Sequence, residues 1–358
     1  MSSTSHYEVV VIGGGQAGLA IGHYLAEQGR RFTILEAADA PAPAWRERWD
    51  SLRLFTPVRY DSLPGKPFPG DPDHHPTRDE VVAYLTDYAR DLPVELSSRV
   101  RELRRDDDRY IVGLDARAYT ADQVVIATGP FQTPRTPSLA SQLDARVIQL
   151  QSTAYRTPSQ IPEGRVLVVG GGNTGYQIAD ELSATHEVHL SVGARQKPVP
   201  QRVLGRDIFR WLDALGALTK TADTRLGRRM KASDTLVGSS PRRARRKGIA
   251  LHPRATGASG STVTFADGRD VEVATVIWAT GFVADHAWVD VPVFDADGVV
   301  VHTRGVTASP GLYFLGLSWM HSRGSALLGW VKDDAAYIAE QIRKHAEAAA
   351  ARTLPPAA

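Results

Sequence analysis

Two glycine-rich turns in the sequence have the spacing that holds a pyrophosphate. The first reads Gly13-Gly14-Gly15-Gln16-Ala17-Gly18 and the second Gly170-Gly171-Gly172-Asn173-Thr174-Gly175. In such a turn the first glycine permits a tight bend, the second lets the backbone approach the phosphates, and the third lets helix and strand pack closely. The helix that follows offers free N–H groups and the positive end of its dipole. The sequence therefore predicts two dinucleotide sites.

The two copies differ at the end of the strand that follows each turn. Glu36 ends this strand in the first copy, and a carboxylate there can accept hydrogen bonds from both hydroxyls of an adenosine ribose. The matching position in the second copy is Gly193, with Arg195 and Lys197 just beyond it. The first site therefore suits FAD or NAD, and the second suits the 2′-phosphate of NADPH, because a guanidinium offers a planar fork of donors. The alternative is that these three charged side chains are simply solvated.

Apolar runs place each glycine turn between a buried strand and a helix. The strand, helix and strand of each copy are expected at 7–12, 17–28 and 32–35, and again at 166–169, 176–184 and 188–192. Much later, each copy has one more apolar strand, which ends in Ala-Thr-Gly at 127–129 and at 279–281. One supersecondary plan is thus repeated within the chain.

This repeat predicts an α/β fold of two Rossmann-like, three-layer dinucleotide-binding domains, the second inserted into a discontinuous first. The expected division is 1–156 for the first part of the FAD domain, 157–284 for the NADPH domain, 285–350 for the second part of the FAD domain and 351–358 for a disordered tail. The stretch 41–78 is rich in proline and is expected to form a long shaped loop.

The composition limits the chemistry. The chain has 358 residues with 42 basic and 40 acidic side chains, so it lacks the concentrated basic field of a nucleic-acid-binding protein. It has no cysteine, which excludes disulfides, thiolate metal sites and a dithiol relay. The adjacent His74 and His75 have no further ligands at useful spacing, so no metal site is expected. No signal peptide or membrane segment is recognisable, which predicts a soluble, cytoplasmic protein without a membrane partner.

The segment Trp45–Pro57, which reads WRERWDSLRLFTP, is more specific than either glycine turn. Other notable segments are Ser152-x-x-Tyr155-Arg156, Trp278–Gly281 and Gly311–Gly316. With the glycine turns, these segments make almost the whole chain resemble the flavin-containing monooxygenases, specifically the small bacterial branch related to the plant YUCCA-type enzymes. The chain departs from that family at Gln151, where the family usually has a histidine.

The resemblance, added to the two turns, assigns residues to two cofactors. The residues expected at FAD are Gly13, Gly15, Gln16, Ala17, Gly18, Glu36, Trp45, Arg46, Thr128, Gly129, Gly316 and Asp334. Those expected at NADPH are Gly170, Gly172, Asn173, Thr174, Gly175, Arg195, Lys197, Thr280 and Gly281. The two Ala-Thr-Gly segments resemble the family's hinge between domains.

The activity that this resemblance implies is the insertion of one oxygen atom from O2 into a small organic molecule, through a C4a-(hydro)peroxyflavin. The substrate would be an amine, a sulfide or a carbonyl compound. The flavin carries the chemistry, so no catalytic triad is expected, and His321 is only a weak candidate beside it. Two alternatives remain open: an NADPH-dependent flavin reductase or oxidase without oxygen insertion, and a non-catalytic flavin-binding sensor. Whether the chain forms a homodimer is also open.

Overall fold

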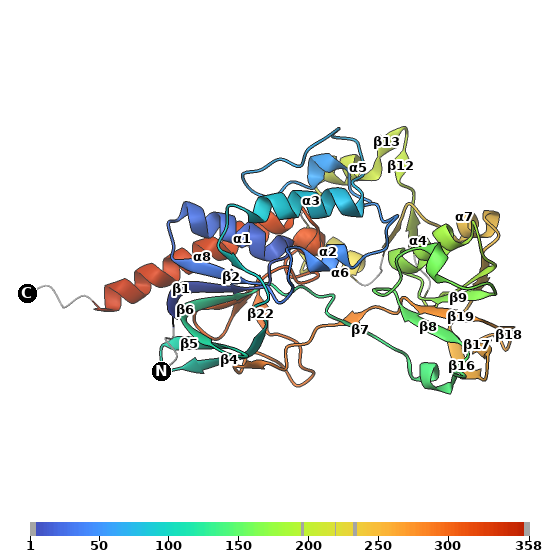
Figure 1. Cartoon of the computed structure of the whole chain (residues 1–358). Coiled ribbons are helices and arrows are strands. Elements are labelled where there is room, and N and C mark those ends of the chain that lie inside the picture. Colours follow the sequence, from blue (N-terminus) through green and yellow to red (C-terminus); the bar gives the residue numbers. More distant parts are fainter. Residues whose placement is uncertain (1–4, 195–196, 219, 232–234, 354–358) are drawn as a thin grey trace, which may run out of the picture.

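The structure is a computed structural model that describes residues 5–194, 197–218, 220–231 and 235–353. It has two α/β lobes side by side, each with helices on one face of a parallel sheet and antiparallel strands on the other (Figure 1). This arrangement confirms the predicted fold class. No helix among these residues is long and apolar enough to cross a bilayer.

The sheet of the first lobe combines a parallel core with an antiparallel meander. Its strands are β1 (Ser5–Ile12), β2 (Phe32–Leu35), β3 (Val94–Glu95), β4 (Val100–Asp106), β5 (Arg109–Leu114), β6 (Ala118–Ile126), β21 (Val289–Asp290), β22 (His302–Thr303), β23 (Val306–Thr307) and β24 (Leu312–Phe314). The central strand β1 is buried on both sides: Val9 and Val11 pack toward the helices, while Val10 and Ile12 pack toward the meander. This double burial explains why the strand reads as an unbroken apolar run.

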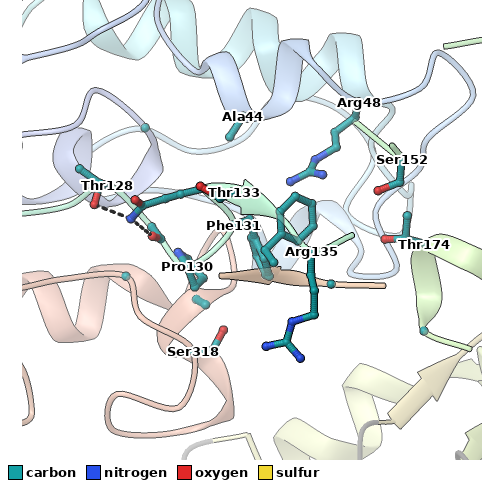
Figure 2. A pocket seen from close by; sticks show the side chains of 18 of the residues that line it. Ala44, Arg48, Thr128, Pro130, Phe131, Thr133, Arg135, Ser152, Thr174 and Ser318 are labelled. Carbon is teal, nitrogen blue, oxygen red and sulfur yellow. Dashed lines mark hydrogen bonds between the residues drawn. The ribbon is translucent and has the colours of Figure 1, made fainter. Parts of the chain in front are cut away.

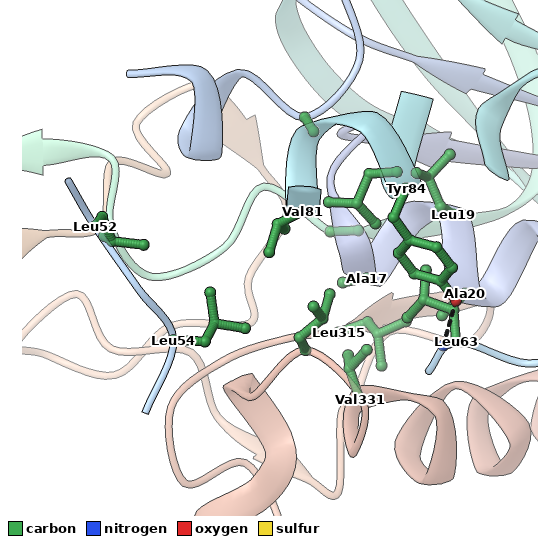
Figure 3. Close-up of a cluster of buried hydrophobic side chains, with 14 of the residues drawn as sticks. Ala17, Leu19, Ala20, Leu52, Leu54, Leu63, Val81, Tyr84, Leu315 and Val331 are labelled. Carbon is green, nitrogen blue, oxygen red and sulfur yellow. Dashed lines mark hydrogen bonds between the residues drawn. The ribbon is translucent and has the colours of Figure 1, made fainter. Parts of the chain in front are cut away.

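Three helices cover the parallel core: α1 (Gln16–Glu27), α3 (Arg78–Ala89) and α8 (Val331–Thr353). Helix α3 begins with a capping box in which Thr77 and Glu80 bond each other's backbone N–H groups. Figure 3 shows how side chains from these helices meet those of the loop 52–63, with the hydroxyl of Tyr84 accepting a hydrogen bond from the backbone N–H of Leu63 at 2.7 Å. The shaped loop at 41–78 holds only α2 (Pro43–Arg46) and the 3-10 turn η1 (Val58–Tyr60).

The second lobe has a five-stranded parallel sheet in the order β15-β10-β9-β19-β8. These strands are β8 (Ile148–Gln151), β9 (Val166–Val169), β10 (Val188–Ser191), β15 (Ala250–His252) and β19 (Thr275–Trp278). The antiparallel sheet beside it contains β16 (Ala255–Ser259), β17 (Thr262–Phe265) and β18 (Asp270–Glu272). Helices α4 (Asn173–Leu182) and α7 (Pro241–Arg246) lie on the opposite face (Figure 1).

Shorter elements join and flank the lobes. They are the helices α5 (Ile208–Ala214) and α6 (Arg225–Lys231), the 3-10 turns η2 (Ser138–Gln142), η3 (Pro158–Gln160) and η4 (Arg323–Ala326), and the strand pairs β7 (Thr133–Pro134) with β20 (Phe282–Val283), β11 (Lys197–Val199) with β14 (Thr235–Val237), and β12 (Arg202–Val203) with β13 (Arg206–Asp207). The pair β7–β20 is where the chain passes from one lobe to the other in each direction.

Two of the predicted boundaries need correction. Strand β8 precedes residue 156 but pairs with β19 in the second sheet, so the first crossing lies nearer Thr133 than the predicted division at 156 and 157. The disordered tail expected at 351–358 is wrong for its first three residues, because α8 continues to Thr353. A run of alanines precedes this end of the helix, and alanine has the highest helix propensity. Residues 354–358 lie outside the described part of the chain.

Candidate active site

One cavity of about 1850 Å³ lies between the lobes and is lined by both glycine turns. Gly13 and Gly15 line it from the first lobe, and Gly170 and Gly172 line it from the second. Figure 2 shows part of its wall, with Ala44 from α2, Thr174 from α4, and Thr133 and Arg135 from the segment that crosses between the lobes. The two sites predicted separately from the sequence therefore open into the same space.

The three glycines of each turn have different surroundings. A Cβ on Gly18 would lie 1.8 Å from the carbonyl oxygen of Gly13, and one on Gly175 would lie 1.9 Å from that of Gly170. These third glycines are required by packing and do not line the cavity. A Cβ on Gly15 or on Gly172 would meet no atom within 4 Å. The middle glycines thus border open space, as expected where a phosphate approaches the backbone.

The helix ends beside these glycines are free to bind an anion. Gly15 and Gly172 are the N-cap residues of α1 and α4, and neither helix has a side-chain cap or an acidic residue in its first turn. Their first N–H groups and positive dipole ends are therefore available to a ligand in the cavity. The backbone of both turns fits a bound pyrophosphate.

Glu36 lies in the cavity wall at the end of β2 and is only 6% exposed. One carboxylate oxygen accepts the backbone N–H of Gly14 at 2.8 Å, and the other accepts that of Ala38 at 2.9 Å. These bonds fix the carboxylate beside the first turn, and each oxygen retains a second lone pair. The geometry agrees with a residue that accepts hydrogen bonds from a ribose.

The segment that begins at Trp45 forms another side of the cavity. The indole N–H of Trp45 donates to Gln16 Oε1 at 3.0 Å, and Gln16 Nε2 donates to the carbonyl of Ala326 at 3.1 Å. Arg46 was predicted at FAD, but it does not line the cavity. Its guanidinium is exposed and bonds the carbonyl of Pro41 and the hydroxyl of Thr86. The side chain of Arg46, at the end of the short helix α2, thus points away from the cavity.

Arg48 lines the cavity and brings a positive charge into it (Figure 2). This residue was not among those expected from the sequence. Its guanidinium carbon lies 5.4 Å from the ring centre of Phe282 and 6.0 Å from that of Phe131. Burial lowers the pKa of Arg48, with the neighbouring charge of Arg156 adding to this effect. The ring faces offset part of the desolvation cost of this half-buried cation.

The two Ala-Thr-Gly segments lie where the chain crosses between lobes. Gly129 and Gly281 both have positive φ, at 74° and 87°, and both line the cavity with Thr128 and Thr280. Gln132 Nε2 donates to the Thr128 hydroxyl at 2.9 Å, and the Thr280 hydroxyl donates to the carbonyl of Arg135. The strands that follow, β7 and β20, pair with each other. That these segments act as a hinge remains a prediction.

Only some of the residues predicted to bind NADPH in the second site line the cavity. Asn173 and Thr174 line the cavity, with the Asn173 amide also bonding the backbone of β14. Lys197 is exposed on β11 and does not line it. Arg195 lies outside the described residues.

A different arginine stands beside the cavity at Gly193. Arg254 follows β15, and its guanidinium lies 3.5 to 3.6 Å from the position that a Cβ on Gly193 would take. Both residues line the cavity. Strands β10 and β15 are parallel neighbours, so their carboxyl ends meet at the same edge of the sheet. The sequence does not reveal Arg254 as a neighbour of Gly193, because Arg254 follows a different strand and is far from Gly193 along the chain.

Three other candidates near the C-terminus have different positions. Gly316 lines the cavity beside Ala17, where a Cβ on Gly316 would lie 2.8 Å from that of Ala17. Asp334 is 3% exposed and pairs with Arg304 at 3.0 Å. Asp334 and His321 border a separate small cavity of about 130 Å³ and not the large one. Neither His321 nor Asp334 therefore lines the cavity into which the glycine turns open.

A contact between distant segments closes the cavity wall near Phe55. Gln201 Nε2 donates to the carbonyl of Phe55 at 2.8 Å and to Asp207 Oδ2 at 2.7 Å. His75 Nε2 lies 3.1 Å from the same carboxylate oxygen. The hydrogen bond to Asp207 raises the pKa of His75. Burial acts to raise the pKa of Asp207, but the hydrogen bonds that its carboxylate accepts outweigh burial and lower it. This ion pair ties the loop 53–78 to the segment 201–207.

Comparison with known proteins places the chain in a family. Residues 10–204 match the family model described as pyridine nucleotide-disulphide oxidoreductase. A CzcO-like oxidoreductase from Geobacillus kaustophilus (strain HTA426), whose own activity is uncharacterized, is 44% identical over 343 residues, covering 94% of this chain and 99% of that protein. The indole-3-pyruvate monooxygenase YUCCA1 of rice (Oryza sativa subsp. japonica) is 32% identical over 218 residues, covering 57% of this chain and 53% of that protein.

Solved structures agree with these relatives. The flavin-containing monooxygenase from Stenotrophomonas maltophilia superimposes with a TM-score of 0.81 at 31% identity, covering 96% of this chain and all of that one. Membership in the wider family brings no disulfide chemistry here, since the chain contains no cysteine. The chain therefore belongs to the pyridine nucleotide-disulphide oxidoreductase family and, within it, to the flavin monooxygenases, and it is a flavin-dependent oxidoreductase.

Proposed function

We propose that this protein is an FAD- and NADPH-dependent monooxygenase, which inserts one oxygen atom of O2 into a small organic molecule. The observation that carries the proposal is the single cavity into which both glycine turns open. A shared cavity allows the nicotinamide of one dinucleotide to approach the flavin of the other, which hydride transfer requires. The family of the chain supports the same chemistry.

In this proposal, residues of the first lobe bind FAD and residues of the second lobe bind NADPH. Glu36 would accept hydrogen bonds from the ribose of FAD, while the N-terminus of α1 would bind its pyrophosphate. The N-terminus of α4 would bind the pyrophosphate of NADPH, and Arg254 would bind its 2′-phosphate. The bound flavin supplies hydride acceptance and oxygen activation.

The chain also shields the reacting atoms from water. Leu52, Leu54 and Trp49 are buried and line the cavity beside Trp45. A dry wall suppresses hydrolysis of reactive intermediates and strengthens electrostatic interactions within the site. We propose an amine, a sulfide or a carbonyl compound as substrate.

The test combines NADPH, ¹⁸O2 and three probe molecules: methyl phenyl sulfide, N,N-dimethylaniline and cyclohexanone. We expect mass spectrometry to find one ¹⁸O atom in a product of at least one probe, with hydrogen peroxide release falling below one per NADPH. Unlabelled probes with one hydrogen peroxide per NADPH would favour a flavin oxidase or reductase. A protein that binds both cofactors but does not consume NADPH would favour the sensor.

A further inference from the structure

Asp61 is a fully buried carboxyl group behind the cavity wall. It is 0% exposed and follows the turn η1. The hydroxyl of Thr56 donates a hydrogen bond to Asp61 Oδ1 at 2.6 Å. Thr56 is itself buried and lines the cavity beside Phe55. One hydroxyl therefore separates this hidden carboxyl group from the cavity.

The other carboxyl oxygen of Asp61 has no partner. Asp61 Oδ2 is buried without a hydrogen bond among the described residues. A buried carboxylate is stable only when donors or a counter-ion compensate the loss of water. Asp61 has one donor on one oxygen, which stabilises the charged form only weakly. The surroundings therefore favour the protonated carboxylic acid.

The charged and titratable groups around Asp61 are few. The hydrogen bond to Asp207 raises the pKa of His75, on the same loop, and a positive charge on His75 acts to lower the pKa of Asp61. Tyr84 faces it from α3, with a pKa raised by burial to about 12, and stays neutral. Gly329, before α8, packs against the Asp61 backbone and brings no charge. Burial outweighs these effects and raises the pKa of Asp61 to about 7.

The protonation state of Asp61 decides which way the Thr56 hydroxyl can point. While Asp61 is ionised, Thr56 must donate its proton to Oδ1. Once Asp61 is protonated, Oδ1–H can donate to Thr56 Oγ1, and the Thr56 proton is then free to face the cavity. The pair thus holds one proton and can pass it to the cavity in two linked transfers.

We propose that Asp61 acts in the oxygen reaction as a positioning residue behind Thr56. Asp61 stores a proton and delivers it to the cavity through the hydroxyl of Thr56. This inference rests on the proposed function, whose balance is substrate + O2 + NADPH + H⁺ giving oxygenated substrate + H2O + NADP⁺. The H⁺ in this balance leaves Asp61 through Thr56, and solvent reprotonates Asp61 before the next turnover.

The first experiment needs no cofactor and reads Asp61 itself. Infrared spectra of the wild-type protein between pH 5 and 9 are expected to show a carboxylic acid C=O band that disappears with a midpoint near pH 7. Asp61→Asn should remove this band. A wild-type protein without the band, or an Asp61→Asn variant that keeps it, would overturn the proposal.

The second experiment measures how fast O2 reoxidises the NADPH-reduced, FAD-loaded protein. We expect the wild-type rate to fall as pH rises through 7, and the rates of Asp61→Asn and Thr56→Val to be at least about tenfold lower and independent of pH. Thr56→Ser, which keeps the hydroxyl, should restore both the rate and the pH dependence. A wild-type profile in Thr56→Val or Asp61→Asn would refute the relay.

Reoxidation by O2 also separates this inference from the proposed function. The rate can be followed whether the oxygen enters a substrate or leaves as hydrogen peroxide, so an oxidase would still report on the relay. The infrared band requires no flavin at all. FAD content and melting temperature of each variant show that a slow rate does not come from a misfolded protein.

Discussion

At the scale of single residues, Arg254 and Arg48 are two cavity-lining cations that were not expected from the sequence. Neither could be recognised from the sequence, because an isolated arginine in a loop carries no signal of its own. Arg254 reaches the second site from the strand beside β10, and Arg48 reaches the cavity by facing inward from the turn after α2. By contrast, the position of Glu36 in the cavity wall could be predicted, because Glu36 ends the strand after the first glycine turn.

Substitution of Arg254 tests the assignment of the phosphate. Arg254→Glu should raise the Kd of NADP⁺ by about tenfold or more, because a charge-assisted hydrogen bond contributes about 1.5–3 kcal/mol. The Kd of NAD⁺, which lacks the phosphate, should change little. Isothermal titration of both dinucleotides gives the comparison, with Arg352→Glu in the exposed last turn of α8 as a matched control. Equal weakening of both dinucleotides would place Arg254 elsewhere on the ligand.

At the scale of elements, the glycine turns show what a local pattern can predict. Strand, turn and helix follow one another within about 30 residues, so their spacing alone places them, and β1, α1 and β2 lie as expected. Helix α4 begins at Asn173, earlier than the predicted 176, because Gly172 serves as its N-cap. The membership of β8 in the second sheet was missed, since pairing over more than a hundred residues leaves no trace in a single sequence.

The glycines of one turn should respond differently to the same substitution. Gly15→Ala has room for its methyl group and a φ of −80°, so the fold should be retained while FAD binding is lost. Gly18→Ala would place its Cβ against the carbonyl of Gly13 and should destabilise the protein by about 1–3 kcal/mol or more. Bound flavin absorbance and thermal unfolding separate the two effects.

The second turn supplies the matched control for this experiment. Gly172→Ala has the same open surroundings and a φ of −79°. It should retain FAD and lose NADPH, which is the opposite of Gly15→Ala. If Gly15→Ala binds FAD as tightly as the wild type, the first turn is not a pyrophosphate site.

At the scale of the whole molecule, two buried groups make stability depend on pH in opposite directions. In the second lobe, His189 Nδ1 and His252 Nε2 are 2.8 Å apart, so the two rings share one hydrogen bond and cannot both be charged without repulsion. Burial lowers the pKa of His252, and the charge of His189 adds to this effect. A lowered pKa means that stability is present above the ordinary histidine pKa and is lost as pH falls through it.

His252→Gln should remove this acid sensitivity. The melting temperature of the wild type is expected to fall relative to that of the variant by about 2 °C or more between pH 7 and pH 5. Differential scanning calorimetry at both pH values measures the change. A constant difference between the two proteins over this range would show that the pair does not titrate.

Asp61 makes stability change with pH in the opposite direction, because burial raises its pKa. The unfolded chain ionises this group near pH 4, while the folded protein retains the proton up to about pH 7. Stability from Asp61 is therefore full below pH 4 and is lost as pH rises toward 7. Relative to Asp61→Asn, the wild-type melting temperature should fall between pH 4.5 and pH 7.5, and a rise over that range would contradict the assignment.

The pairing of β7 with β20 has a consequence for how such enzymes diversify. The chain leaves the first lobe and returns to it through two adjacent strands, so the backbone crosses between the lobes at one place. The large sheet of the first lobe is complete without it, since all its strands lie before residue 127 or after residue 288. Grafting at Thr133 and Val283 would exchange the second lobe for that of a relative through two new peptide junctions, provided that the contacts of Gln201 and Asp207 with the loop 53–78 are kept. Such a graft is expected to transfer the coenzyme preference of the relative together with its second lobe.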